Sequence, residues 1–379
     1  MKYPPLSLLT AGLLLAPAGL PGSFAADLYS EPFDSEATAK IGSSNGTGMI
    51  VSYVDYSGVT VGALLHNIPE APRKIAGSAS TRGVLIQVNY PAAPAATERI
   101  ANLIALDDVG GSRVLFPDNY RVKCDVYLRL SPAVTLSPTS GLPTNTGTTE
   151  QFLWGVGYNA TLPMGRGWRT GRGSGVWGWL ATEGGHSATV PISDAALWTD
   201  GSGVASRDMS LTSADLAAYF TPAFGADASP VPHCPANQWV EATISVLGGQ
   251  VTVEYQAVGR AKTKFFENVA GSVAGGVMVG YEDSFSSNSF DPDNQWLLLD
   301  NLVVEDLTPP TMVVNSSSSV VTFTGAPTIG TFTVSNAQIA GDLTISALNF
   351  TGTHAADFSA ATPLPLVIPA GSSAPLSIQ

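Results

Sequence analysis

One aspartate occupies a position where a strand pattern calls for an apolar side chain. The stretch DPDNQWLLLDNLVV, from Asp291 to Val304, runs from polar turn formers into a segment that is apolar on both faces. Strict strand alternation places Asp300 on one side with Trp296, Leu298, Leu302 and Val304. A buried carboxylate without a partner is costly, so Asp300 must bind a cation, take part in catalysis or fasten the fold.

Aromatic side chains offer a second chemistry, which is the binding of sugar rings. In VWGWL, Trp177 and Trp179 point to one side of a predicted strand. Aromatic faces stack on sugars, and an arginine in the nearby Gly-rich loop can bond to hydroxyls. The alternative, which we favour, is that the aromatics fill the interior, because tryptophans are usually well buried. The candidate carbohydrate-binding residues are Trp177, Trp179, Trp154, Tyr158 and Arg169.

Strand patterns dominate the elements that must position these residues. In NYRVKCDVYLRL, apolar side chains from Tyr120 to Leu130 alternate with polar ones, as in a strand with one wet face. A hairpin is predicted over 237–259 with its turn at Gly248 and Gly249, and a single helix over 212–220. Further strands are predicted within 82–90, 150–159, 175–184 and 275–283. We therefore expect an all-β protein of two packed antiparallel sheets.

A second, smaller domain is predicted after Pro309 and Pro310, which break any strand. The segment 309–379 contains short strand patterns within 330–338, 341–350, 363–371 and 374–379. This spacing indicates an immunoglobulin-like β domain, although the Cys…Trp…Cys signature is absent.

The N-terminus and the charge limit where the protein acts and what it binds. Residues 1–25 have one lysine, a Leu/Ala-rich run and small residues before Ala26, which predicts a cleaved export signal and a secreted or cell-surface protein. No later stretch is long and apolar enough to insert into a membrane. A formal net charge of -13 argues against nucleic acid as a partner. The oligomeric state stays open.

The two cysteines, Cys124 and Cys234, allow two interpretations. In an oxidising compartment they can pair, and closing so large a loop contributes about 4–5 kcal/mol in the chain-entropy description. Alternatively Cys124, on the inward face of its predicted strand, is a buried free thiol.

Several of these segments together resemble known families. PFDSE, DNYRVKCDVYL, NQWVEATISVLGGQVTVEYQ and VMVGYEDSFSS…LLLDNLVVEDL resemble a concanavalin A-like (laminin-G/lectin/glucanase) jelly roll over about 27–307. The tail, with FTVSN, GDLTI, HAADF and IPAG, resembles a choice-of-anchor D (ASH-like) module over 309–379. That family continues with further strands, so the resemblance implies a truncated module.

The jelly-roll resemblance implies two roles for Asp300. First and last strands of this fold commonly lie side by side, which brings EPFDSE close to it. Asp34, Asp300 and the Asn301 amide then form a candidate calcium site. Alternatively, Asp300 accepts backbone N–H bonds from the N-terminal segment and fastens the two chain ends. We favour fastening, because calcium takes six to eight oxygens and only three side chains are in view.

The resemblance also raises the question of catalysis, because glucanases share this fold. They carry E-x-D-x-x-E or E-x-D-x-E on one strand, and this chain has neither. EPFDSE has the wrong spacing, and GSSNG (42–46) lacks the strand-to-helix elbow of a serine nucleophile. We predict a non-catalytic secreted protein that binds carbohydrate. The alternatives are a structural or adhesive segment without a small ligand, and a glycoside hydrolase.

Overall fold

The computed structural model describes nineteen stretches of the chain, and the statements below concern those residues. They are 27–35, 41–43, 50–75, 81–88, 90, 100–108, 111–139, 144, 150–158, 175–182, 195–199, 202–207, 234–283, 289, 291–308, 312–315, 329–336, 341–350 and 355–379. The predicted helix at 212–220 lies outside them. Within these stretches, no helix has the length and apolar character needed to cross a membrane.

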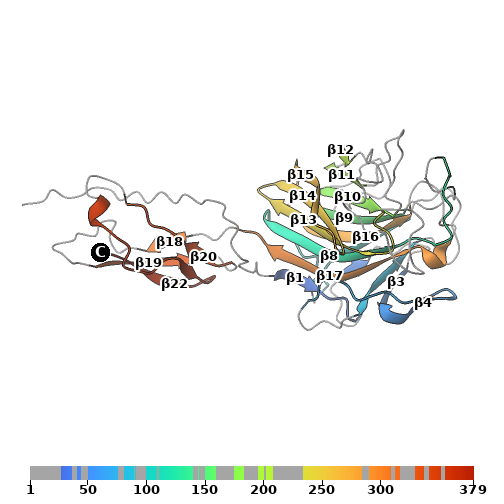
Figure 1. The fold of residues 1–379 in the computed structure, drawn as a ribbon, viewed down its shortest axis with the longest axis horizontal. Helices are drawn as coiled ribbons and strands as arrows, with labels where there is room; N and C mark the ends of the chain where they lie inside the picture. Colours follow the sequence, from blue (N-terminus) through green and yellow to red (C-terminus); the bar gives the residue numbers. More distant parts are fainter. Residues whose placement is uncertain are drawn as a thin grey trace, which may run out of the picture. The chain divides into compact units, whose positions relative to one another are not determined.

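Residues 27–305 form a jelly-roll β-sandwich of two antiparallel sheets (Figure 1), which confirms the predicted fold class. One sheet has the order β15-β14-β13-β8-β17-β6-β3, with β1 also paired to β17. Its strands are β1 (Asp27–Glu31), β3 (Ile50–Asp55), β6 (Arg82–Gln87), β8 (Tyr120–Arg129), β13 (Trp239–Leu247), β14 (Gln250–Ala257), β15 (Thr263–Ala270) and β17 (Trp296–Asp306).

The second sheet has the order β12-β11-β10-β9-β16-β7-β2. Its strands are β2 (Ile41–Ser43), β7 (Ile100–Leu106), β9 (Glu150–Tyr158), β10 (Val176–Ala181), β11 (Ala195–Thr199), β12 (Ser202–Arg207) and β16 (Gly276–Asp283). A 3-10 turn, η4 (Pro292–Asn294), precedes β17. We call this one the seven-stranded sheet, and the sheet that contains β8 and β17 the eight-stranded sheet.

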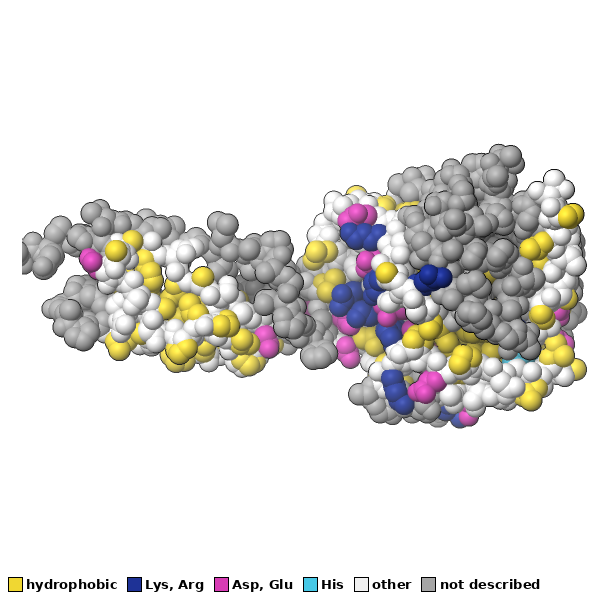
Figure 2. Space-filling view, viewed as in Figure 1, with side chains coloured by type: hydrophobic (Ala, Val, Ile, Leu, Met, Phe, Trp, Pro, Cys, Tyr) yellow, Lys and Arg dark blue, Asp and Glu magenta, His cyan; other side chains and the backbone are white. Residues whose placement is uncertain are grey.

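The main core lies between the two sheets and follows the alternation read from the sequence. On β8, Tyr120, Val122, Cys124, Val126 and Leu128 are buried in it. The intervening Arg121 and Lys123 lie on the outer face, and Figure 2 shows Lys and Arg side chains among Asp and Glu on this unit. Burial of each aliphatic or aromatic side chain contributes about 1.5–3 kcal/mol to folding, so this core supplies most of the hydrophobic stabilisation of the sandwich.

The predicted hairpin is confirmed as β13 and β14. Leu247 pairs with Gln250, leaving Gly248 and Gly249 as a two-residue turn. Both glycines have left-handed φ angles, 58° and 77°, as a type I′ turn requires. The turn sets the register that turns Val240, Ala242, Ile244 and Val246 towards the core.

Strand β17 departs from strict alternation. Leu297 and Leu299 belong to the core between the sheets, and so do Leu302 and Val304. The phase therefore shifts by one residue between Leu299 and Leu302, where Asn301 has a left-handed φ of 52°. The predicted grouping of Asp300 with Leu302 and Val304 is wrong, because the step turns Leu302 and Val304 into the main core, whereas Asp300 stays on the outer side with Trp296 and Leu298.

A third layer covers part of the outer face of the eight-stranded sheet. It consists of η2 (Tyr56–Gly58), the hairpin of β4 (Val59–Val61) with β5 (Leu64–His66), and residues 67–75. We call residues 67–75 alone the strap. A second core lies beneath it, and its side chains are Tyr56, Val59, Val61, Ile68, Ala71, Leu85, Tyr127, Trp239, Trp296 and Leu298. The strap is therefore packed on the sheet by apolar contacts as well as polar ones.

The second compact unit comprises the described residues from Asp306 onward and has its own small core. Strands β18 (Met312–Asn315), β19 (Gly330–Asn336) and β22 (Ser373–Ile378) form one sheet, and β20 (Leu343–Ile345) pairs with β21 (Leu366–Ile368). A 3-10 turn, η5 (Ala355–Asp357), lies between β20 and β21 in sequence. Its immunoglobulin-like and choice-of-anchor D character remain predictions.

The separate cores predict stepwise proteolysis of the full chain. The core of the second unit centres on Val334, Leu343, Ile345, Ile368 and Leu376, far fewer side chains than the sandwich buries. A smaller core gives a lower free energy of unfolding, so limited proteolysis should degrade 306–379 first and leave a fragment ending near Glu305. Survival of the tail while the sandwich is digested would contradict this.

Candidate functional site

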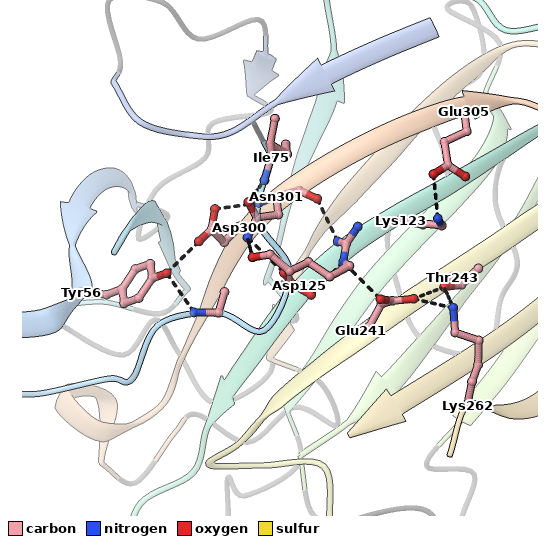
Figure 3. A network of polar contacts seen from close by, with 12 residues as sticks. Tyr56, Ile75, Lys123, Asp125, Glu241, Thr243, Lys262, Asp300, Asn301 and Glu305 are labelled. Carbon is pink, nitrogen blue, oxygen red and sulfur yellow. Dashed lines mark hydrogen bonds and ion pairs between the residues drawn. The ribbon is translucent and has the colours of Figure 1, made fainter. Parts of the chain in front are cut away.

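Asp300 accepts two short hydrogen bonds on the outer side of the eight-stranded sheet (Figure 3). The Tyr56 hydroxyl donates to Oδ2 at 2.7 Å, and the backbone N–H of Asn301 donates to Oδ1 at 2.7 Å. The Tyr56 oxygen in turn accepts the N–H of Ala71 at 3.3 Å. Asp300 therefore connects β17 to η2 and, through Tyr56, to the strap.

Asn301 makes the direct connection to the strap. Its Nδ2 donates to the carbonyl of Arg73 at 2.8 Å and to Asp125 Oδ2 at 3.0 Å, and its Oδ1 accepts the N–H of Ile75 at 3.1 Å. A left-handed backbone is tolerated better by asparagine than by most residues. The strained residue is thus held by three side-chain hydrogen bonds.

Arg73 extends the network across the sheet. Its Nε lies 3.0 Å from Asp125 Oδ1 and 3.3 Å from Glu241 Oε2, and its Nη2 donates to the Asn301 carbonyl at 2.8 Å. Lys262 also contacts Glu241, at 2.5 Å. The arrangement joins the strap to β8, β13 and β17 through charge-assisted bonds, which are stronger than neutral ones.

Burial controls the ionisation of the acids in this network. Desolvation raises the pKa of Asp300 to about 8, against the two donated hydrogen bonds, and the charges of Asp125 and Asp34 raise it further. Desolvation likewise raises the pKa of Asp125, although Arg73 and Asn301 oppose it. Asp300 is therefore largely protonated at neutral pH.

The calcium site proposed from the sequence stays a prediction, and in the structure its residues have other partners. Strands β1 and β17 do pair, with Asp27 opposite Glu305, so the chain ends lie side by side as expected. However, both oxygens of Asp300 and the Oδ1 of Asn301 already accept hydrogen bonds, and the Asp34 carbonyl accepts one from Arg82 Nε at 2.5 Å. Among the described residues, no three His, Cys, Asp or Glu side chains gather as metal ligands. Asp300 acts as a fastener, but its partners are the Tyr56 hydroxyl and the Asn301 N–H, not the N-terminal segment.

The predicted aromatic residues divide between two faces of the seven-stranded sheet. Trp154 lies in the main core, and its Nε1 donates to the Tyr255 hydroxyl at 2.9 Å. Trp177 and Trp179 lie on the opposite, outer face, with ring centroids 6.2 Å apart. Both are buried, with exposed fractions of 2% and 1%. Tyr158 is described only as a backbone position on β9, and Arg169 lies outside the described residues.

Two polar residues on that outer face were not anticipated from the sequence. Gln151 of β9 stands opposite Glu282 of β16 and Ala181 of β10, so all three share the face that carries Trp179. Gln151 is fully buried, and neither its Nε2 nor its Oε1 has a hydrogen-bond partner in the structure. A buried amide left in this state costs about 1–3 kcal/mol for each unsatisfied group.

A pair of carboxyl groups lies on the inner face of the same two strands. Glu150 stands directly opposite Asp283, and both are buried. Gln295 Nε2 donates to Glu150 Oε1 at 2.7 Å, whereas Glu150 Oε2 has no partner in the structure. Burial, followed by the charge of Asp283, raises the pKa of Glu150 well above its ordinary value. These residues are far apart in sequence, so only the strand register could have shown the pairing.

Cys124 and Cys234 are free thiols in this structure. Cys124 lies in the main core, whereas Cys234 lies in a separate cluster with Leu130, Val134 and Ala236. Burial raises the pKa of the Cys124 thiol to about 12, so it stays protonated and behaves as a small apolar side chain.

No protein-family description matches the chain, and no curated protein matches it. Solved structures resemble it in fold. A Bacillus subtilis protein of unknown function with a galectin-like fold is 8% identical, with a TM-score of 0.37 over 75% of this chain and 97% of that one. The VIP36 exoplasmic/lumenal domain, in a form bound to Ca2+ and Man2, is 10% identical, with a TM-score of 0.35 over 69% of this chain and 82% of that one.

A prokaryotic β-1,3-1,4-glucanase (lichenase) from a mouse hindgut metagenome is 8% identical, with a TM-score of 0.33 over 74% of this chain and 98% of that one. Lectins and a hydrolase thus stand together among the similar folds. At such identities and TM-scores the likenesses carry no argument about function, which rests on the residues above.

The raised pKa of Asp300 predicts how stability depends on pH. The native pKa of about 8 lies above the ordinary 3.8, so the folded state holds this proton more tightly than the unfolded chain. The resulting stabilisation is fully present below about pH 4 and is lost as the pH rises through 8. Asp300→Asn makes the side chain neutral at every pH, so the variant should lose less stability as the pH rises and should be more stable than the wild type at pH 9. Each pKa unit by which the native state exceeds the unfolded chain corresponds to about 1.4 kcal/mol. Chemical denaturation at pH 5, 7 and 9 measures this. Parallel pH profiles for the two proteins would contradict it.

Proposed function

We propose that the first unit binds carbohydrate on the outer face of the seven-stranded sheet, without catalysis, and that the protein acts outside the cytoplasm. The observation that carries this proposal is the Gln151 amide. It is fully buried without a hydrogen-bond partner, on the same face as Trp177 and Trp179. A bound ligand with its own donors and acceptors would satisfy it.

The chemistry of this face suits a sugar better than most ligands. A sugar ring presents C–H groups that pack on aromatic faces, and hydroxyls that both donate and accept. Trp179 offers the apolar contact, Gln151 can donate and accept, and the Glu282 carboxylate can accept. Gly280 follows in the same row of β16, opposite Leu153.

The positions of the carboxyl groups favour binding over hydrolysis. Retaining glycosidases need two carboxyl groups about 5–5.5 Å apart on either side of the scissile bond. Glu282 lies on the outer face of β16, but Asp283 and Glu150 lie on its inner face, towards the core. In the described part of β9, β10 and β16, Glu282 therefore has no second carboxyl group beside it on the outer face. The proposal of non-catalytic action rests on these positions, and the proposal of action outside the cytoplasm rests on the export signal predicted from the sequence.

One observation favours a different class of function. Trp177 and Trp179 are 2% and 1% exposed, which is the burial expected of structural residues rather than of an open platform. The second candidate is therefore a structural or adhesive segment of a surface protein without a small ligand.

One substitution separates the two candidates. Gln151→Met has a similar volume but no polar atoms, so it should raise the free energy of unfolding by roughly 1–3 kcal/mol. A glycan array first identifies a neutral oligosaccharide that the full wild-type chain binds. Under the binding proposal, Gln151→Met should lower the affinity for this oligosaccharide, measured by calorimetry, by at least about tenfold. Trp154→Phe, a change in the core on the other face, should lower stability and leave binding unchanged. A wild-type chain that binds no glycan would leave the structural candidate.

A further inference from the structure

A cleft of about 330 Å³ lies on the outer side of the eight-stranded sheet, away from the face proposed for carbohydrate. Arg73, Lys74 and Ile75 of the strap line one side. Asn301, Val303 and Glu305 of β17, with Asp27 of β1, line the other. A volume of this size is at the lower end of small-ligand sites.

The wall formed by the strap is fixed in place. Arg73 and Ile75 are held to Asn301 by hydrogen bonds from both backbone and side chain, at 2.8–3.1 Å. Arg73 is also bonded to Asp125 and Glu241. A ligand would therefore meet a preorganised wall and would lose little affinity to ordering it.

One end of the cleft is suited to a cation. Asp27 stands directly opposite Glu305 across β1 and β17, and two acids in that position repel each other. Lys123 and Arg121 already pair with Glu305, whereas the Asp27 carboxylate makes no side-chain hydrogen bond or ion pair within the described residues. Partial burial, and then the charge of Glu305, raises the pKa of Asp27, and the charge of Lys123 opposes this rise only in part. A ligand ammonium group here would relieve both effects.

The other end is suited to an anion. The Lys74 side chain is 54% exposed and has one contact, with Glu70 at 3.4 Å, a surface pair of little energy. The contacts of Arg73 use its Nε and Nη2, which leaves Nη1 available within the described network. Between the two ends lie Ile75 and Val303, which are apolar.

We propose that this cleft binds a small zwitterion of the amino-acid class, with its ammonium group at Asp27 and its carboxylate at Lys74 and Arg73. The apolar part of the ligand lies against Ile75 and Val303. Neither a simple acid nor a simple amine uses both ends, so the site selects molecules that carry both charges.

Three probes with five carbons test the proposal on the full chain: 5-aminopentanoate, pentanoate and pentylamine. Backbone amide shifts of Ile75, Asn301 and Val303 are followed by NMR during titration. The zwitterion should give saturable shifts and bind at least about tenfold more tightly than either singly charged probe. No saturable shift, or equal affinities for the three probes, would overturn the proposal.

Two variants assign the ends of the site. Asp27→Asn should lower the affinity for 5-aminopentanoate to that for pentanoate, and Lys74→Gln should lower it to that for pentylamine. Lys264→Gln is the matched control, because Lys264 is also a surface lysine, 52% exposed and paired with Glu267 on β15. Thermal melts check that each variant is folded. If the control weakens binding as much as Lys74→Gln does, the attraction is non-specific and the proposal fails.

Discussion

The first unit depends on a one-residue change of side-chain phase in β17. Before the change, residues 297–299 pair with β6, and after it residues 302–305 pair with β1. Because the backbone of Asn301 is left-handed, Leu297 and Leu299, which precede it, point into the same core as Leu302 and Val304, which follow it. One strand can therefore close the sandwich against two different partners.

The same change turns Asn301 outward, next to Asp300, which faces outward by ordinary alternation. A non-glycine residue in the left-handed region costs of order 1–3 kcal/mol, and here hydrogen bonds to Ile75, Arg73 and Asp125 offset that cost. Asp300 adds the bond from Tyr56, whose ring lies in the second core beneath the strap. The fastening of the strap and the β17 wall of the charged cleft thus depend on one backbone irregularity. The outer face of the seven-stranded sheet has no part in this fastening.

The sequence predicted what depends on local patterns and missed what depends on pairing. Alternation on β8 and the Gly248–Gly249 turn were predictable, because each follows from a few neighbouring residues. The step at Asn301 has only a weak local signal, an Asp-Asn dipeptide, since asparagine also occupies ordinary strand positions. The Gln151–Glu282 and Glu150–Asp283 rungs need the register of β9 and β16, which no local pattern supplies. Tyr56 as the partner of Asp300 was missed for the same reason, since it comes from far away in the chain.

Hydrogen exchange at the Ile75 amide tests this account most directly. Asn301→Gly keeps the left-handed backbone without strain and removes the side chain that holds the strap. The account predicts that Ile75 exchanges at least about tenfold faster in this variant, while the amides of β8 and β13 keep their protection. Asn268→Gly, at another asparagine with a left-handed φ of 56°, should leave Ile75 as protected as in the wild type. An Ile75 amide that stays equally protected in Asn301→Gly would contradict the claim that Asn301 holds the strap.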